Sequence, residues 1–75
     1  MRVPASDTVR LAIRLELTRA GMTQQQLAGL LSEHDSWVSR RLTGITPLTV
    51  DDLDRIAYAM GLPVATFLVE HDQAS

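Results

Sequence analysis

The sequence predicts an all-α fold, a compact five-helix bundle. Apolar residues recur every three or four positions in successive segments, cap-forming residues bound these segments, and no segment alternates as a strand does. Seventy-five residues are enough for one domain and too few for two. We therefore expect a single domain over residues 1–75, with an ordered core at about 6–69 and a polar tail at 70–75.

The first predicted helix lies between Ser6, which is suited to cap its start, and Gly21, which is suited to end it. One face of this helix is apolar and is expected to enter the core; it comprises Val9, Ala12, Ile13, Leu17 and Ala20. Leu11 and Leu15 fall outside that stripe. The helix is therefore apolar on more than one side, and we expect it to have a second neighbour.

A pair of short helices follows. Thr23 and Gln26 have the spacing of a capping box, which predicts a second helix from there to about Leu31. Residues 32–35 contain no apolar side chain and form the expected connection. The third helix is predicted over about 35–42. Its core-facing side chains are expected to be Val38 and Leu42, and its solvent-facing side chains Ser36, Ser39, Arg40 and Thr43.

The C-terminal part contains two further predicted helices. Gly44 is expected to end the third helix. Thr49 is a suitable N-cap for a fourth helix over about 50–60. Three aspartates in the first turns of this helix complement the positive end of the helix dipole. Pro63 suits the first position of a short fifth helix that extends to about Val69.

Composition excludes several classes of protein. No apolar stretch approaches the roughly 18 residues that span a bilayer, and the N-terminal residues lack the apolar core of a signal peptide. The sequence has no cysteine, no glycine-rich phosphate loop and no serine–histidine–acid grouping, and its two histidines are far apart. We therefore expect a cytoplasmic protein that is not an enzyme, with no cofactor, no metal site and no membrane partner.

Charge is unevenly distributed along the chain. The formal net charge is −2 and the sequence pI is near 5.5, which is unusual for a protein that binds nucleic acid. However, six arginines against four acidic residues give residues 1–44 a net charge of +2, whereas one arginine against five acidic residues gives residues 45–75 a net charge of −4. We expect a dipolar molecule whose N-terminal part tolerates a polyanion.

The second and third helices have the spacing of a helix-turn-helix. The residue pattern is more specific than the spacing, since Gln24 opens the second helix, Ala28 follows four residues later and Ser32 lies at the turn. Together with the segments 21–24, 37–44 and 56–64, this pattern resembles the xenobiotic-response-element (XRE) family of helix-turn-helix regulators, which includes the lambdoid phage repressors and Cro proteins. The resemblance covers nearly the whole chain. It implies a lambda-repressor-like DNA-binding domain with the third helix in the major groove.

The resemblance also implies which residues contact DNA. Base edges would be reached from Asp35, Ser36, Ser39 and Arg40, and phosphates from Thr23, Gln24, Arg41 and Thr43. Arg40 is the leading candidate, because its guanidinium group can donate to O6 and N7 of guanine together. Trp37 is expected to pack against the second helix rather than to stack on DNA.

The sequence departs from the family pattern in ways that bear on recognition. Ser32 stands where relatives usually have glycine, so it must adopt the turn geometry with a side chain or use a different turn. Glu33 and Asp35 would face phosphates unfavourably, and Asp35 either accepts from cytosine N4 or caps the third helix. Leu17 and Leu42 stand where some relatives pair an arginine with a glutamate, and an apolar contact replaces such a pair easily.

These observations favour a sequence-specific transcriptional regulator. We expect a Cro-like or small repressor that binds double-stranded DNA at an inverted-repeat operator as a homodimer, without a small-molecule effector. Its dimer surface is expected in the fifth helix and the segment before it, at Leu62, Val64, Phe67, Leu68 and Val69, although these residues also suit a core. The alternative is a protein-interaction module, such as an antirepressor, an adaptor or an antitoxin, which keeps the fold with weak or no DNA binding.

Overall fold

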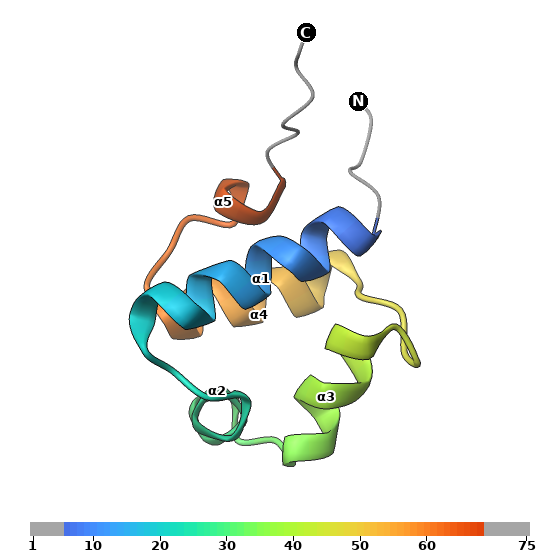
Figure 1. Ribbon diagram of the computed structural model, residues 1–75, viewed down its shortest axis with the longest axis vertical. Coiled ribbons are helices and arrows are strands. Elements are labelled where there is room, and N and C mark those ends of the chain that lie inside the picture. The colour runs from blue at the N-terminus through green and yellow to red at the C-terminus, as the bar shows by residue number, and fades with distance from the viewer. Residues whose placement is uncertain (1–5, 69–75) are drawn as a thin grey trace, which may run out of the picture.

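The computed structural model describes residues 6–68, which form five helices and no strand (Figure 1). The helices are α1 (Ser6–Ala20), α2 (Gln24–Leu31), α3 (Asp35–Thr43), α4 (Val50–Met60) and α5 (Ala65–Leu68). The prediction of an all-α, five-helix fold is confirmed. Val69 and the predicted polar tail lie outside the described residues.

Two matching capping boxes fix where α2 and α4 begin. At α2, the Thr23 hydroxyl accepts from the backbone N–H of Gln26 at 3.0 Å, and the Gln26 side chain accepts from the backbone N–H of Thr23 at 2.9 Å. At α4, Thr49 and Asp52 make the same reciprocal pair at 3.0 and 3.1 Å. Each box satisfies two backbone groups that a helix start leaves without partners. The capping box predicted at Thr23 is therefore present, and Thr49 is the N-cap predicted for α4.

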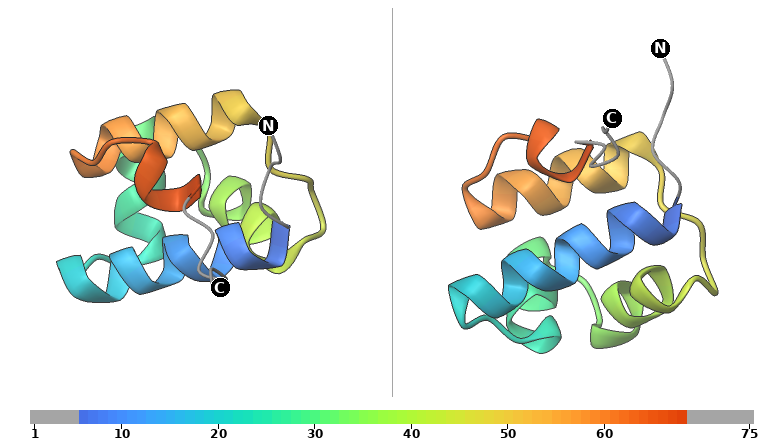
Figure 2. Two further views of the ribbon diagram at one scale, coloured as in Figure 1. Left: turned by 90° about the horizontal axis from the view of Figure 1, so that it is seen from above. Right: turned by 45° about the horizontal axis from the view of Figure 1, so that its top comes forward.

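The helices are arranged so that α2 and α3 stand apart from α5. In Figures 1 and 2, α2 and α3 lie on one side of α1 and α4, and α5 lies on the other. The contacts agree, because α2 packs on α3 and α4, α3 packs on α1, and α5 packs on α1 and α4. The helix pair predicted to meet DNA is thus displayed at one end of the molecule.

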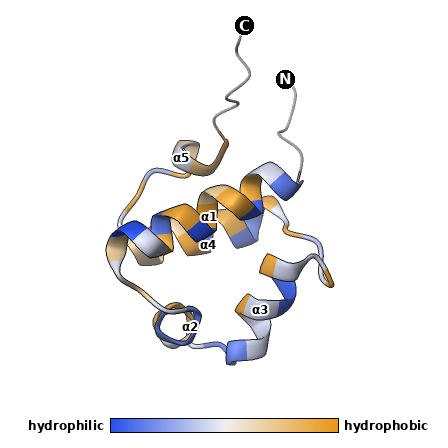
Figure 3. Cartoon of the chain, viewed as in Figure 1, coloured by the Kyte–Doolittle hydropathy of each residue, from blue (hydrophilic) through white to orange (hydrophobic). Residues whose placement is uncertain are grey.

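One apolar core joins all five helices. It consists of Val9, Ile13, Leu17, Leu27, Ala28, Leu31, Val38, Leu42, Leu53, Ile56, Ala57 and Phe67. Leu17 and Leu42 are both in this cluster, so apolar packing occupies the place where some relatives have an ion pair. Figure 3 shows apolar residues along α1 and α4, whereas α3 is mostly polar. The polarity of α3 fits a helix whose outer face meets something other than the core.

Three helix boundaries differ from the prediction. α1 includes Ser6, so Ser6 is not its N-cap, and α3 runs one residue further, to Thr43. α5 begins at Ala65 rather than at Pro63. The reason at α5 is local, since the Pro63 carbonyl accepts from the backbone N–H of Thr66 at 2.9 Å in a turn that precedes the helix.

Candidate nucleic-acid interface

The turn between α2 and α3 contains a residue in a backbone conformation that favours glycine. Ser32 has φ 58° and ψ 39°, and it is the only non-glycine residue with positive φ in residues 6–68. Its N–H donates to the carbonyl of Gly29 at 3.1 Å, and the next N–H, of Glu33, donates to that of Ala28 at 2.9 Å. Ser32 therefore adopts the left-handed turn geometry with a side chain, at a backbone cost of about 1–2 kcal/mol.

The residues predicted to reach bases are displayed on the outer face of α3. Val38 and Leu42 are buried and hold the helix against the core. Asp35, Ser36, Arg40 and Thr43 are exposed, and Ser39 is half-buried. Asp35 is the first residue of the helix, and His34 is its N-cap, without a side-chain capping bond. Asp35 is therefore not the N-cap of α3, which was one of the two roles predicted for it from the sequence.

The residues predicted to contact phosphates differ in whether their polar atoms already make hydrogen bonds within the protein. Thr23 and Gln24 lie at the start of α2, where backbone N–H groups and the helix dipole favour an anion. Thr23 is exposed and its hydroxyl accepts from Gln26, which leaves its O–H free to donate. The Thr43 hydroxyl donates to the carbonyls of Ser39 and Arg40, at 2.9 and 3.3 Å, so it meets a phosphate only by turning away from its own helix.

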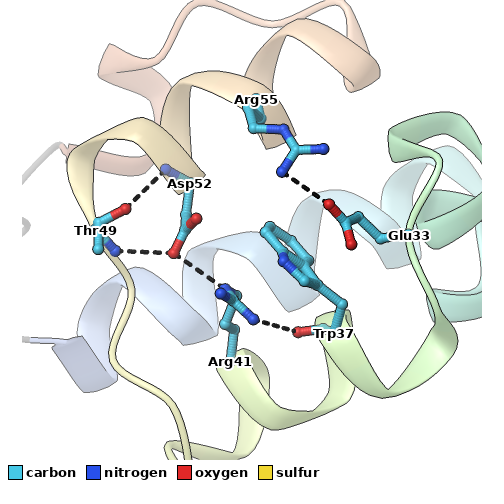
Figure 4. A network of polar contacts seen from close by, with 6 residues as sticks. All are labelled: Glu33, Trp37, Arg41, Thr49, Asp52 and Arg55. Carbon is cyan, nitrogen blue, oxygen red and sulfur yellow. Dashed lines mark hydrogen bonds and ion pairs between the residues drawn. The ribbon is translucent and has the colours of Figure 1, made fainter.

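Arg41 is held inside the molecule (Figure 4). Its Nε donates to Oδ2 of Asp52 at 3.0 Å, and its Nη1 donates to the carbonyl of Trp37 at 3.2 Å. Its guanidinium carbon lies 3.9 Å from the centroid of the Trp37 ring. Both side chains of the ion pair are mostly buried. The group predicted to seek a phosphate instead ties α3 to the start of α4.

A second arginine closes the same network from α4. Arg55 donates to Oε2 of Glu33 at 3.1 Å and to the carbonyl of Leu31 at 2.9 Å. Its guanidinium carbon lies 5.1 Å from the Trp37 ring, and Figure 4 shows that ring between Arg41 and Arg55. Trp37 thus makes contacts within the protein, with two guanidinium groups. The charge of Glu33, which would repel phosphates, is paired with a cation.

Asp52 is the anionic centre of this network. Burial raises the pKa of its carboxyl group, but the hydrogen bonds from Thr49 and Arg41 and the charge of Arg41 outweigh burial. The net result is a pKa below the ordinary value of an aspartate. Asp52 is therefore ionised at neutral pH and serves both as a capping residue of α4 and as the anchor of Arg41.

Two arginines of α1 lie at the C-terminal end of α3, and sequence reasoning missed both. Arg14 donates to the carbonyl of Leu42 at 2.9 Å. The guanidinium group of Arg10 pairs with Asp7 and lies beside Gly44, where a Cβ would be 3.4 Å from it. Cations at a helix C-terminus are favourable because they meet unpaired carbonyls. The signal was present in the sequence as two arginines four residues apart, next to the apolar stripe of the first helix.

Arg40 differs from the other arginines of residues 6–68 because its side chain makes no hydrogen bond or ion pair there. Four of the remaining five are paired with carboxylates, and the fifth is Arg14. Arg40 is exposed and lies on the outer face of a helix whose last turn is bonded to α1 and α4. Its five N–H donors are consequently free for a ligand with paired acceptors, such as the major-groove edge of guanine.

The segment expected to form a dimer surface is largely used by the core of its own chain. Phe67 is fully buried, which corrects the prediction that its side chain faces a partner. Leu62, Val64 and Leu68 are half-buried and pack against the core, and Val69 lies outside the described residues. Within the described residues α5 packs on this side of α1 and α4, and Phe67 is its buried side chain.

The described residues contain neither a membrane-spanning helix nor a cluster of metal ligands. Within the described residues no helix is long and apolar enough to cross a membrane. The same part of the chain brings no three histidine, cysteine or acidic side chains together as metal ligands.

Comparison with known proteins places the fold in a family. The family model described as "Helix-turn-helix domain" matches residues 10–67. A solved structure from Neisseria, described as that of the hypothetical transcription factor NHTF, is similar with a TM-score of 0.80 and 17% sequence identity. The match covers 97% of this chain and 88% of that one. No curated protein has significant similarity. The chain therefore belongs to the helix-turn-helix domain family of DNA-binding domains.

Proposed function

We propose that this protein regulates transcription by binding a specific sequence of double-stranded DNA through α3. The observation that supports this most is the state of Arg40, an exposed arginine without an internal partner in residues 6–68, on the outer face of a helix whose last turn is bonded to α1 and α4. A fixed helix matters because a bidentate contact to guanine requires its donors to be held in register with the base edge.

Seven polar residues of the helix pair have a role in this proposal. Arg40 binds guanine, Ser36 and Ser39 donate to or accept from neighbouring bases, and Asp35 accepts from cytosine N4. Thr23, Gln24 and Thr43 bind phosphates and set the position of α3 in the groove. Arg41 is excluded from these contacts, because its guanidinium group is already bonded to Asp52 and Trp37.

We further propose a Cro-like mode of action, in which a dimer occupies an inverted-repeat operator and blocks a promoter. A nine-residue α3 reads only a few base pairs, so two copies are needed to make a site selective. Two-fold symmetry in the protein then requires two-fold symmetry in the operator, with half-sites about one helical turn apart. Regulation by occupancy needs no small-molecule effector.

Selection of bound duplexes from a random-sequence pool tests this function. The purified chain is used at low salt, because contacts with phosphates weaken steeply as salt rises. The expected result is an enriched inverted repeat with a guanine at a fixed place in each half. A folded protein that enriches no sequence would refute the proposal and favour the protein-interaction module.

A further inference from the structure

One exposed stripe of α1 has no covering element among the described residues. Asp7, Leu11, Leu15 and Arg19 are spaced by four residues, which places them in a row along one side of the helix. Leu11 and Leu15 are 56% and 51% exposed. A shallow groove bordered by Thr66 of α5 runs beside these two leucines.

The stripe points away from the core. The buried stripe of α1 is Val9, Ile13 and Leu17, each two residues from a leucine of the exposed stripe. Two residues correspond to a rotation of about 200° around a helix, so the two stripes lie on nearly opposite sides. α1 packs on both α3 and α5, but within residues 6–68 neither of these helices covers Leu11 and Leu15.

The stripe is complementary to itself when reversed. It reads acid, leucine, leucine, base, so two antiparallel copies align Asp7 with Arg19 of the other copy, and Leu11 with Leu15 of the other copy. Both charged side chains are free to meet a partner, since they remain 90% and 74% exposed despite their contacts within α1. Rows of residues spaced by four are also the ridges through which helices most often pack.

We propose that a second copy of this chain covers the stripe, and that the dimer forms through antiparallel α1 helices. This interface differs from the dimer surface predicted at α5, where the largest side chain, Phe67, is buried in the core of its own chain. All four residues of the stripe belong to α1, and none belongs to α2 or α3. The role of the dimer at an operator rests on the proposed function, but the association itself does not.

Paired charge variants test the antiparallel register. Asp7→Arg and Arg19→Asp each place like charges opposite one another in the homodimer, and both are expected to be monomeric in sedimentation at concentrations where the natural chain associates. An equimolar mixture restores opposite charges at both contacts, so it is expected to form a heterodimer. Circular dichroism confirms that each variant is folded. A mixture that stays monomeric, or variants that associate as the natural chain does, would overturn the proposal.

Leucine variants test the apolar part of the contact. Leu15→Glu is expected to weaken self-association by about 10-fold or more. Leu30→Glu is the matched control, because Leu30 is 58% exposed on α2 and outside the stripe, and it is expected to leave self-association unchanged. Equal effects of the two variants, or a natural chain that is monomeric at about 1 mM, would contradict the contact.

Disulfide formation distinguishes antiparallel from parallel pairing. The natural sequence has no cysteine, so Leu11→Cys and Leu15→Cys introduce the only thiols. Mild oxidation of a mixture is expected to join the two variants to each other more than to themselves. Preferential joining of each variant to itself would refute the antiparallel register. All these measurements are made without DNA, so a chain that pairs but selects no operator would refute the proposed function alone.

Discussion

Removal of the Asp52 carboxylate is expected to destabilise the domain strongly. Asp52→Ala deletes the charged hydrogen bond from Arg41 and the acceptor for the Thr49 N–H. A buried hydrogen bond to a charged group contributes about 1.5–3 kcal/mol, and a helix cap contributes about 1 kcal/mol. Arg41 keeps its bond to the Trp37 carbonyl, which limits the cost of an unpaired cation. We expect a loss of about 3 kcal/mol.

Thermal and urea unfolding followed by circular dichroism measure this loss. For a domain of this size 1 kcal/mol shifts Tm by roughly 4–8 °C, so Asp52→Ala is expected to lower Tm by about 12–24 °C. Asp54→Ala is the control, because Asp54 is an exposed acid on the same helix and its loss is expected to change stability by less than about 0.5 kcal/mol. A loss below about 1 kcal/mol for Asp52→Ala would refute the anchoring role.

The same carboxylate gives stability a defined dependence on pH. Because the folded-state pKa of Asp52 is depressed, its contribution is present in full above the ordinary pKa of about 4. The contribution is lost as the pH falls through the lower, folded-state pKa. We therefore expect Asp52→Asn to be less stable than the natural chain at pH 7, with the difference shrinking below about pH 4. A difference that stays constant down to pH 2 would contradict the pKa shift.

Three further predictions concern the helix pair and its ligand. Ser32→Gly is expected to stabilise the domain by about 0.5–1 kcal/mol, because relief of the left-handed backbone exceeds the added flexibility of the unfolded chain, and a lower Tm would contradict this. Arg14→Ala is expected to lower the free energy of unfolding by about 1–2 kcal/mol through loss of the bond to the Leu42 carbonyl, measured by urea titration against Arg40→Ala as an unpaired control. Four of the six arginines in residues 6–68 are paired with carboxylates, which leaves two per chain and four per dimer to neutralise phosphates. Log affinity for DNA should therefore fall with log salt with a slope no steeper than about −4 for a dimer, and a slope near −8 would show more phosphate contacts than the arginines without a carboxylate partner provide.

Local signals in the sequence were sufficient for most of the fold. Thr23 and Thr49 mark the starts of α2 and α4 because a capping box needs only residues three apart. The apolar periodicity of α1 and α4 likewise depends on neighbours within the same helix. The resemblance to a family added the expectation of a lambda-repressor-like domain, and Ser32 took the turn geometry in spite of its side chain.

The partners of the arginines were not predictable in this way. Arg40 and Arg41 are adjacent and chemically identical, yet one is exposed without a partner in the described residues and the other is bonded to Asp52, eleven residues away. Spacing places Arg40 on the solvent-facing side of the helix, but the partner of Arg41 depends on how α3 packs against α4, which spacing does not specify. The roles of Arg14 and Arg55 also arise from contacts across 28 and 24 residues, respectively.

The most direct test of DNA recognition by α3 is to repeat the selection of bound duplexes with Arg40→Ala and Arg40→Lys. Loss of the guanidinium fork is expected to remove the preference for guanine at one position in each half-site and to leave the other positions unchanged. Arg40→Lys should keep more of the affinity than Arg40→Ala while losing the same preference, because it retains the charge without the fork. Selected sequences identical to those of the natural chain would contradict the account.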